Sequence, residues 1–143
     1  MKIVDLAIND VNRIVSLYKD NFADGWNKGM LESAFNSGRF LCIGIEEDNK
    51  LIGLICCSLT DYDADIEGIT IDNEYRKNGF AKALLGLLEV RLVEKKIEKV
   101  FLEVRQSNTP AKNLYLGAGY KEISLRKKYY SDGEDAVIMA QAL

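Results

Sequence analysis

One segment of the chain sets its architecture, and it reads Ile71-Asp72-Asn73-Glu74-Tyr75-Arg76-Lys77-Asn78-Gly79-Phe80-Ala81-Lys82. The pattern predicts the end of a strand, a turn of small and basic residues, and the start of a long helix. The first amides of a helix have no partners inside it, and the peptide dipoles favour negative charge there. Arg-x-x-Gly-x-Ala at residues 76–81 therefore predicts a cradle for a diphosphate, with an ordinary basic helix start as the alternative.

Apolar residues at helical spacing follow this turn and predict a helix from Gly79 to Lys96 that packs on a sheet. Period-two patterns and turn residues predict the remaining elements. We expect a mixed α/β sheet flanked by helices, because strands and helices alternate beyond residue 65. The other predicted helices run from Asn9 or Asp10 to about Phe22, from Trp26 to Asn36, and from Thr109 to Gly117. The predicted strands are Phe40–Glu46 and Leu51–Leu59, which form a hairpin, then Asp65–Ile71, Val100–Val104, Tyr120–Lys128 and Ala136–Ala142, the last two around a turn at residues 131–133.

Length and charge limit the classes of protein that fit. A chain of 143 residues, 48% of them hydrophobic, is the size of one domain, so we expect a single domain over residues 1–143. A net charge of -3 argues against a protein that coats nucleic acid. Asp5 and Asp10 interrupt any signal-peptide core, and the longest apolar run, Leu51–Leu59, is too short to span a bilayer. We therefore expect a cytoplasmic protein with no membrane partner.

Cysteine and histidine usage restricts the chemistry. Cys42, Cys56 and Cys57 lie in apolar runs without Cys-x-x-Cys spacing, which favours small buried side chains over a zinc site. The chain has no histidine, so the usual general base and the commonest metal ligand are both absent. Proton transfer must use Glu, Asp, Tyr, Lys or Cys.

The chain resembles the GNAT acyltransferase superfamily, in which a strand followed by Arg/Gln-x-x-Gly-x-Gly/Ala binds the diphosphate of acetyl-CoA. The resemblance is good over residues 65–143 and is one of pattern only before them. It implies a mostly antiparallel twisted sheet, splayed where the acetyl donor binds, and no metal. Further motifs look like those of the ribosomal-protein alanine N-acetyltransferases within that superfamily: Leu102–Asn108, Ala111–Tyr120, Arg126–Tyr130 and Gly133–Met139.

The resemblance also implies roles for particular residues. Glu103 is the implied general base and Tyr115 the implied general acid. Ala81 stands where a second glycine is more usual, which is acceptable if its φ is negative, and Asn78 adds a polar side chain to the turn. The residues implied to bind acetyl-CoA are Ile69, Thr70, Ile71, Arg76, Lys77, Asn78, Gly79, Phe80, Ala81, Lys82 and Asn108.

Each implied role has a chemical reason and a plainer alternative. A carboxylate at the end of a buried strand can take the proton of an attacking amine, and a phenol can protonate a leaving thiolate of similar basicity. Glu103 could instead be a solvated strand residue, and Tyr115 a packing residue with a satisfied hydroxyl. Asn108 could cap the helix that begins near Thr109, alone or together with a contact to CoA.

Two further segments are candidates for acceptor binding. Asp61, Asp63, Asp65 and Glu67 alternate, which places them on one face of an extended segment. That face could attract a cationic substrate or could merely be solvated; a calcium loop is disfavoured because Ile66 stands where glycine is needed. Arg126–Tyr130 is either a wall for an acceptor peptide or a basic exposed strand.

The leading functional hypothesis is an acetyl-CoA-dependent N-acetyltransferase that acts on a protein N-terminal α-amine by direct attack in a ternary complex. The resemblance implies that the acceptor is the N-terminal alanine of a small-subunit ribosomal protein. One alternative is a small-molecule acetyltransferase for a polyamine or an aminoglycoside, favoured by a closed acidic pocket. Another is a non-catalytic acyl-CoA-binding module. The sequence does not predict an oligomeric state.

Overall fold

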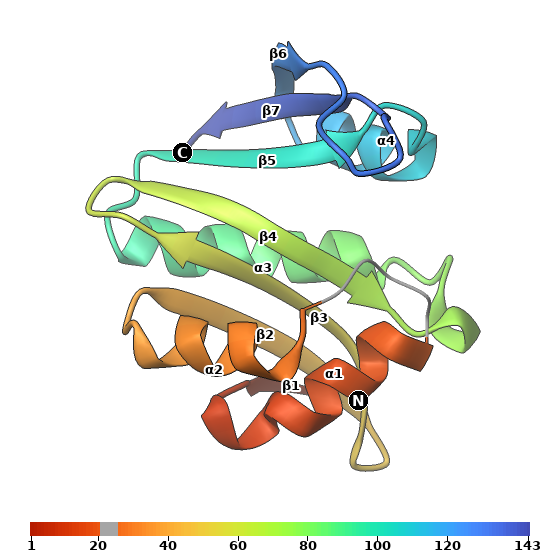
Figure 1. Cartoon of the computed structure of the whole chain (residues 1–143). Helices are drawn as coiled ribbons and strands as arrows, with labels where there is room; N and C mark the ends of the chain where they lie inside the picture. The colour runs from red at the N-terminus through yellow and green to blue at the C-terminus, as the bar shows by residue number, and fades with distance from the viewer. Residues whose placement is uncertain (21–25) are drawn as a thin grey trace.

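The computed structural model describes residues 1–20 and 26–143. Figure 1 shows its strands and helices; a short 3-10 turn, η1 (Ile8–Asp10), precedes the first helix, and a second, η2 (Asn73–Tyr75), follows β4. The helices are α1 (Val11–Asp20), α2 (Lys28–Asn36), α3 (Phe80–Glu94) and α4 (Thr109–Gly117). The strands are β1 (Lys2–Asp5), β2 (Phe40–Glu47), β3 (Lys50–Leu59), β4 (Asp63–Ile71), β5 (Lys99–Arg105), β6 (Lys121–Arg126) and β7 (Ala136–Ala142).

All seven strands join one sheet in the order β1-β2-β3-β4-β5-β7-β6. Neighbouring strands are antiparallel except β4 and β5, which are parallel and are connected through α3. A parallel pair needs a long crossover, and a helix supplies it. In Figure 1 α1 and α2 lie on one side of the sheet and α3 on the other.

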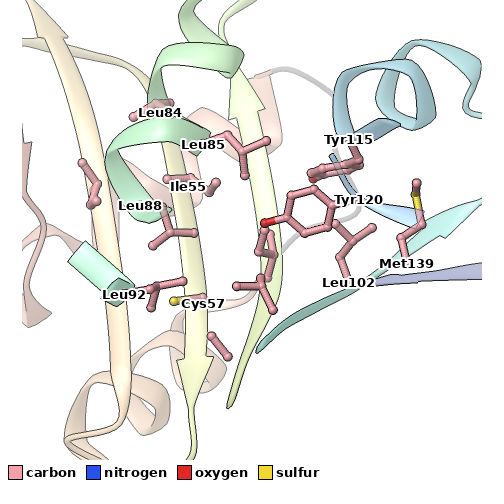
Figure 2. Close-up of a cluster of buried hydrophobic side chains, with 14 of the residues drawn as sticks. Ile55, Cys57, Leu84, Leu85, Leu88, Leu92, Leu102, Tyr115, Tyr120 and Met139 are labelled. Atoms are coloured by element: carbon pink, nitrogen blue, oxygen red, sulfur yellow. The ribbon is translucent and has the colours of Figure 1, made fainter. Parts of the chain in front are cut away.

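Each face of the sheet carries its own hydrophobic core. The core beneath α3 contains the apolar stripe expected from the sequence, and Leu84, Leu85, Leu88 and Leu92 are all buried there (Figure 2). The core beneath α1 and α2 contains Ile14, Leu17, Tyr18 and Leu31. Burying one such side chain contributes about 1.5–3 kcal/mol, so two cores of this kind hold both faces rigidly.

The expected mixed α/β sheet flanked by helices is confirmed, with differences in detail. β1, a four-residue strand at the sheet edge, was not predicted from the sequence. β4 begins at Asp63 instead of Asp65, and β6 ends at Arg126 instead of residue 128. The predicted end of the first helix near Phe22 lies outside the described residues. Across residues 1–20 and 26–143 we find no helix with the length and apolarity needed to cross a membrane.

The three cysteines are buried and carry free thiols. Cys42 and Cys56 lie directly opposite each other on β2 and β3 within the core beneath α1 and α2. Burial raises the pKa of Cys57 to about 12, so this thiol is protonated at neutral pH and behaves as a small apolar side chain. In the part of the chain that the structure describes, no three His, Cys, Asp or Glu side chains are arranged to hold a metal.

Strand β4 is irregular at its middle. Its register against β3 shifts so that Cys57 pairs with Ile66 while Cys56 pairs with Gly68, which leaves Glu67 as an extra residue in a bulge. The pairing of β4 with β5 runs from Asp63–Lys99 to Ile66–Leu102, and no β4–β5 pair is found beyond it in the described chain. The bulge and the end of this pairing coincide, as is common next to functional sites.

Replacing Gly68, beside this bulge, by alanine is expected to destabilise the protein by about 1–3 kcal/mol. An added Cβ would lie within 2.3 Å of the buried Tyr18 hydroxyl, and the ring has little room to move. Gly86→Ala is the matched control, because no atom lies within 4 Å of its Cβ position in α3. There the better helix propensity of alanine should stabilise by about 0.5–1 kcal/mol.

Urea unfolding of both variants measures this difference. The double variant Tyr18→Phe with Gly68→Ala should recover part of the loss, because the hydroxyl that causes the clash is gone. An unchanged unfolding midpoint for Gly68→Ala would contradict the close approach of Tyr18 to β4.

Candidate active site

The turn before α3 has the features of an anion site. Gly79 is the N-cap of α3 with φ +79°, and its Cβ position has no atom within 4 Å. The first bond of the helix is donated by the Ala83 amide to the Gly79 carbonyl oxygen at 3.0 Å. The amides of Phe80, Ala81 and Lys82 therefore precede the helical ladder, and the helix dipole makes their end of α3 attractive to a phosphate.

Side chains of the same turn brace it. Arg76 donates through Nε to the Ile71 carbonyl oxygen at 3.1 Å. Asn78 donates to the carbonyl oxygens of Tyr75 and Arg76, each at 3.2 Å. Asn78, the unusual residue of the motif, thus serves the shape of the turn. Lys77 has φ +64°, whereas Ala81 is not among the residues with positive φ, so the alanine in the second small position is accommodated.

The strand before the turn presents backbone groups toward β5. Residues 68–71 of β4 pair with β3 along one edge, and beyond Ile66 the other edge has no registered partner among residues 1–20 and 26–143. Ile69 and Ile71 pack toward the core beneath α3, while Thr70 is buried on the opposite face of the sheet. Backbone N–H and C=O groups along this edge are available to an extended ligand such as the arm of CoA.

A large groove lies on the face of the sheet that carries α2. Its volume is about 990 Å³, and residues of β4, β5, α2, β6 and β7 line it. Asp63, Asp65, Glu67 and Glu103 give it four carboxylates, and Arg126 is the cation among its lining residues. Asp61, the first member of the acidic run, does not line the groove and pairs with Arg39 at 2.9 Å.

The acidic residues perturb one another. Burial raises the pKa of Asp65, and the charges of Asp63 and Glu103 raise it further. Burial also raises the pKa of Glu67, with a hydrogen bond from Ser58 opposing the shift and the charges of Asp65 and Glu103 adding to it. A carboxyl group with a raised pKa in a groove is a candidate general base. The sequence does not predict that role for Glu67, because its place in the β4 bulge depends on strand register.

Glu103 is held at the edge of the groove by the last residue of β6 and by the segment that follows it. Its Oε1 lies 3.3 Å from Nη1 of Arg126, and the Glu103 side chain is 33% exposed. Tyr129 hydrogen-bonds to the Glu103 carboxylate, which raises the pKa of the tyrosine, and the Arg126 guanidinium lies 5.6 Å from the centre of its ring. Arg126, Tyr129 and Tyr130 line the groove, as the peptide-wall interpretation of residues 126–130 requires.

Tyr115 lies on the other face of β5 from Glu103. Side chains alternate along the strand, so Leu102 and Val104 enter the core beneath α3 while Glu103 enters the groove. Tyr115 is in that core, 5% exposed, with its ring edge-on to Tyr120 at 5.6 Å between centroids (Figure 2). Burial raises the pKa of Tyr115. The two residues lie on opposite faces of β5, so a reacting group would have to pass between β4 and β5 to meet both.

Asn108 caps α4, which carries Tyr115. Its Oδ1 accepts the Ala111 amide at 3.2 Å, and Pro110 occupies the first turn. This confirms the capping interpretation, and the cap fixes the start of the helix that positions Tyr115. A contact between Asn108 and CoA stays a prediction.

Known proteins that are similar in sequence and structure are consistent with this arrangement of the site. The profile of the acetyltransferase (GNAT) family matches residues 11–120. The chain belongs to this family. Members transfer an acetyl group from acetyl-CoA, and the chain is therefore an acetyl-CoA-dependent acyltransferase. The resemblance noted from the sequence is confirmed, as is the expected fold.

Relatives within the GNAT family carry a more specific name. The chain is 36% identical over 135 residues to the ribosomal protein bS18-alanine N-acetyltransferase of Haemophilus ducreyi, covering 92% of both chains. It superposes on the crystal structure of the ribosomal-protein-S18-alanine N-acetyltransferase of Escherichia coli with a TM-score of 0.86 at 30% identity, over 99% of this chain and 92% of that one. The NatC complex bound to a Gag peptide and CoA also shares the fold, with a TM-score of 0.86 at 22% identity, over 100% of this chain and 99% of that one.

Proposed function

We propose that this GNAT enzyme acetylates the N-terminal α-amine of a protein, and specifically the N-terminal alanine of a small-subunit ribosomal protein. The proposal rests on the position of two sites. The acidic groove at Glu103 and the anion-binding start of the helix at Gly79 lie on opposite sides of the point where β4 and β5 stop pairing. The names of the relatives supply the acceptor.

The two proton transfers of the proposed reaction take place on opposite faces of β5. An acceptor amine in the groove loses its proton to Glu103 and attacks the acetyl carbonyl carbon. A C–N bond forms, the C–S bond breaks, and Tyr115 supplies the proton that the CoA sulfur takes up. The turn at residues 76–82, with the β4 edge at residues 69–71, would hold the CoA diphosphate and its arm. Asn108 would contact that arm from the start of α4.

Acid–base arithmetic favours an α-amine over a lysine. An α-amine with a pKa near 8 costs about 1.4 kcal/mol to deprotonate at pH 7, whereas a lysine near 10.4 costs roughly 4.6 kcal/mol. A single carboxylate base suffices for the first. The size and mixed lining of the groove also favour a peptide over a small polyamine or aminoglycoside, which needs a closed acidic pocket.

Partners and location follow from the same proposal. The acceptor is a protein N-terminus, with no role for nucleic acid or membrane. Buried free thiols suit the reducing cytoplasm, where ribosomal proteins are made. The chain would work as a single domain over residues 1–143.

A peptide screen tests the acceptor. Short peptides that differ in their first residue are incubated with acetyl-CoA and the enzyme, and products are located by mass spectrometry. We expect acetyl transfer to the α-nitrogen of Ala-first peptides, and complete loss of product when that α-amine is capped. Acetylation that survives capping would place the acetyl group on lysine and contradict the proposal, while tight CoA binding without transfer to any peptide or amine would favour a non-catalytic module.

A further inference from the structure

The groove has an apolar part that the proposed chemistry does not use. Ile123 of β6 and Met30 of α2 both line it, and their side chains are 55% and 51% exposed. Ile138 of β7 lies in the groove as well. Exposed apolar side chains that converge on one concave surface mark a binding site more often than isolated ones do.

A bulge directs Ile123 to this surface. The register of β6 against β7 pairs Glu122 with Met139 and Ser124 with Ile138, so Ile123 has no residue opposite it. Bulges next to active sites re-aim a side chain. Met139 belongs to the core beneath α3, whereas Ile138 and Ile123 line the groove. The extra residue therefore brings Ile123 to the same face of the sheet as Glu103.

The strand register gives the distance between this apolar surface and the proposed base. Glu103 pairs with Ile138, and Ile138 pairs with Ser124, so the path from β5 to β6 crosses two strand spacings. At about 4.8 Å per spacing this is roughly 10 Å. An extended peptide advances about 3.3 Å per residue, so with its α-amine at Glu103 the third residue lies roughly 7–8 Å along this path, between Ile138 and Ile123.

We infer that the enzyme recognises an apolar or aromatic side chain at the third residue of its acceptor, seated on Ile123 and Ile138. The inference rests on the proposed function, because it takes the α-amine to lie at Glu103. Charge argues for the direction of the peptide: the acidic residues of β4 and β5 attract its ammonium end, which leaves the apolar surface for residues further along.

The test compares the peptides Ala-Gly-Phe-Gly-Ser and Ala-Gly-Ser-Gly-Ser, with Ala-Phe-Gly-Gly-Ser as the control for position. We expect kcat/KM about tenfold higher for the peptide with Phe third than for the peptide with Ser third, from partial burial of one aromatic side chain. Phe in second place should give less than half of that gain. Ile123→Ser should reduce the tenfold preference to about twofold.

Leu125→Ser is the matched control, because Leu125 lies on the same strand with 44% of its side chain exposed but does not line the groove. It should keep the full preference. Equal rates for both peptides, with acetylation intact, would overturn this inference and leave the proposed function standing. No acetylation of any of the peptides would overturn both, and a change in oligomeric state of Ile123→Ser with unchanged peptide preference would assign the surface to self-association instead.

Discussion

Glu103→Gln is expected to lower kcat for an Ala-first peptide by about 10²–10⁴-fold while the Kd for CoA stays unchanged. Glutamine keeps the shape of the side chain and can still face Arg126, but it cannot take the proton of the acceptor amine. Steady-state release of the CoA thiol measures the rate, and calorimetry with CoA measures binding. The separation of the two readouts matters, because a misfolded variant would lose both.

Glu67→Gln is the comparison that locates the base. Burial raises the pKa of Glu67, and its side chain lines the same groove, so it is a second candidate for the base. Its loss in kcat should be clearly smaller than that of Glu103→Gln. A larger loss for Glu67→Gln would show that Glu67 is the base. Undiminished rates in both variants would show that neither Glu67 nor Glu103 acts as the base.

Tyr115→Phe is expected to lower kcat by about 10²–10⁴-fold, again with CoA binding retained. The phenol is buried and its raised pKa keeps it protonated through neutral and mildly alkaline pH, which is the state that a general acid requires. The variant keeps the ring that packs edge-on to Tyr120, so the core should be little disturbed.

The leaving group distinguishes acid catalysis from packing. An acetyl donor whose thiol has a lower pKa needs less help from an acid, so the loss caused by Tyr115→Phe should shrink with such a donor. Tyr120→Phe is the packing control, since Tyr120 sits in the same cluster with its hydroxyl 3.4 Å from Glu89. An identical loss with both donors would show that Tyr115 acts only as a packing residue.

Features encoded by short-range patterns were predictable from the sequence. The turn at residues 76–82 and the stripe of Leu84, Leu85, Leu88 and Leu92 depend on neighbours within a few positions, and both are found where expected. The cap at Asn108 is of the same kind. The family and the fold also follow from motifs that are local in the chain.

Features that depend on strand register were not predictable. The opposite placement of Glu103 and Tyr115 about β5, the bulges at Glu67 and Ile123, and the pairing of Arg126 with Glu103 all join segments far apart in the chain. A shift of one residue in any strand would turn each of these side chains to the other face. β1 was missed because four residues carry too short a period-two pattern.

The central claim is that acetyl transfer takes place at the point where β4 and β5 part. The acceptor amine lies beside Glu103 in the groove, and the CoA sulfur lies beside Tyr115 on the core side. A crystal structure with CoA joined covalently to the N-terminus of an Ala-first peptide tests it most directly. We predict the diphosphate on the amides of residues 80–82, the peptide nitrogen facing Glu103, and the sulfur facing Tyr115. A diphosphate bound elsewhere, or a sulfur with Tyr115 turned away from it, would contradict the account.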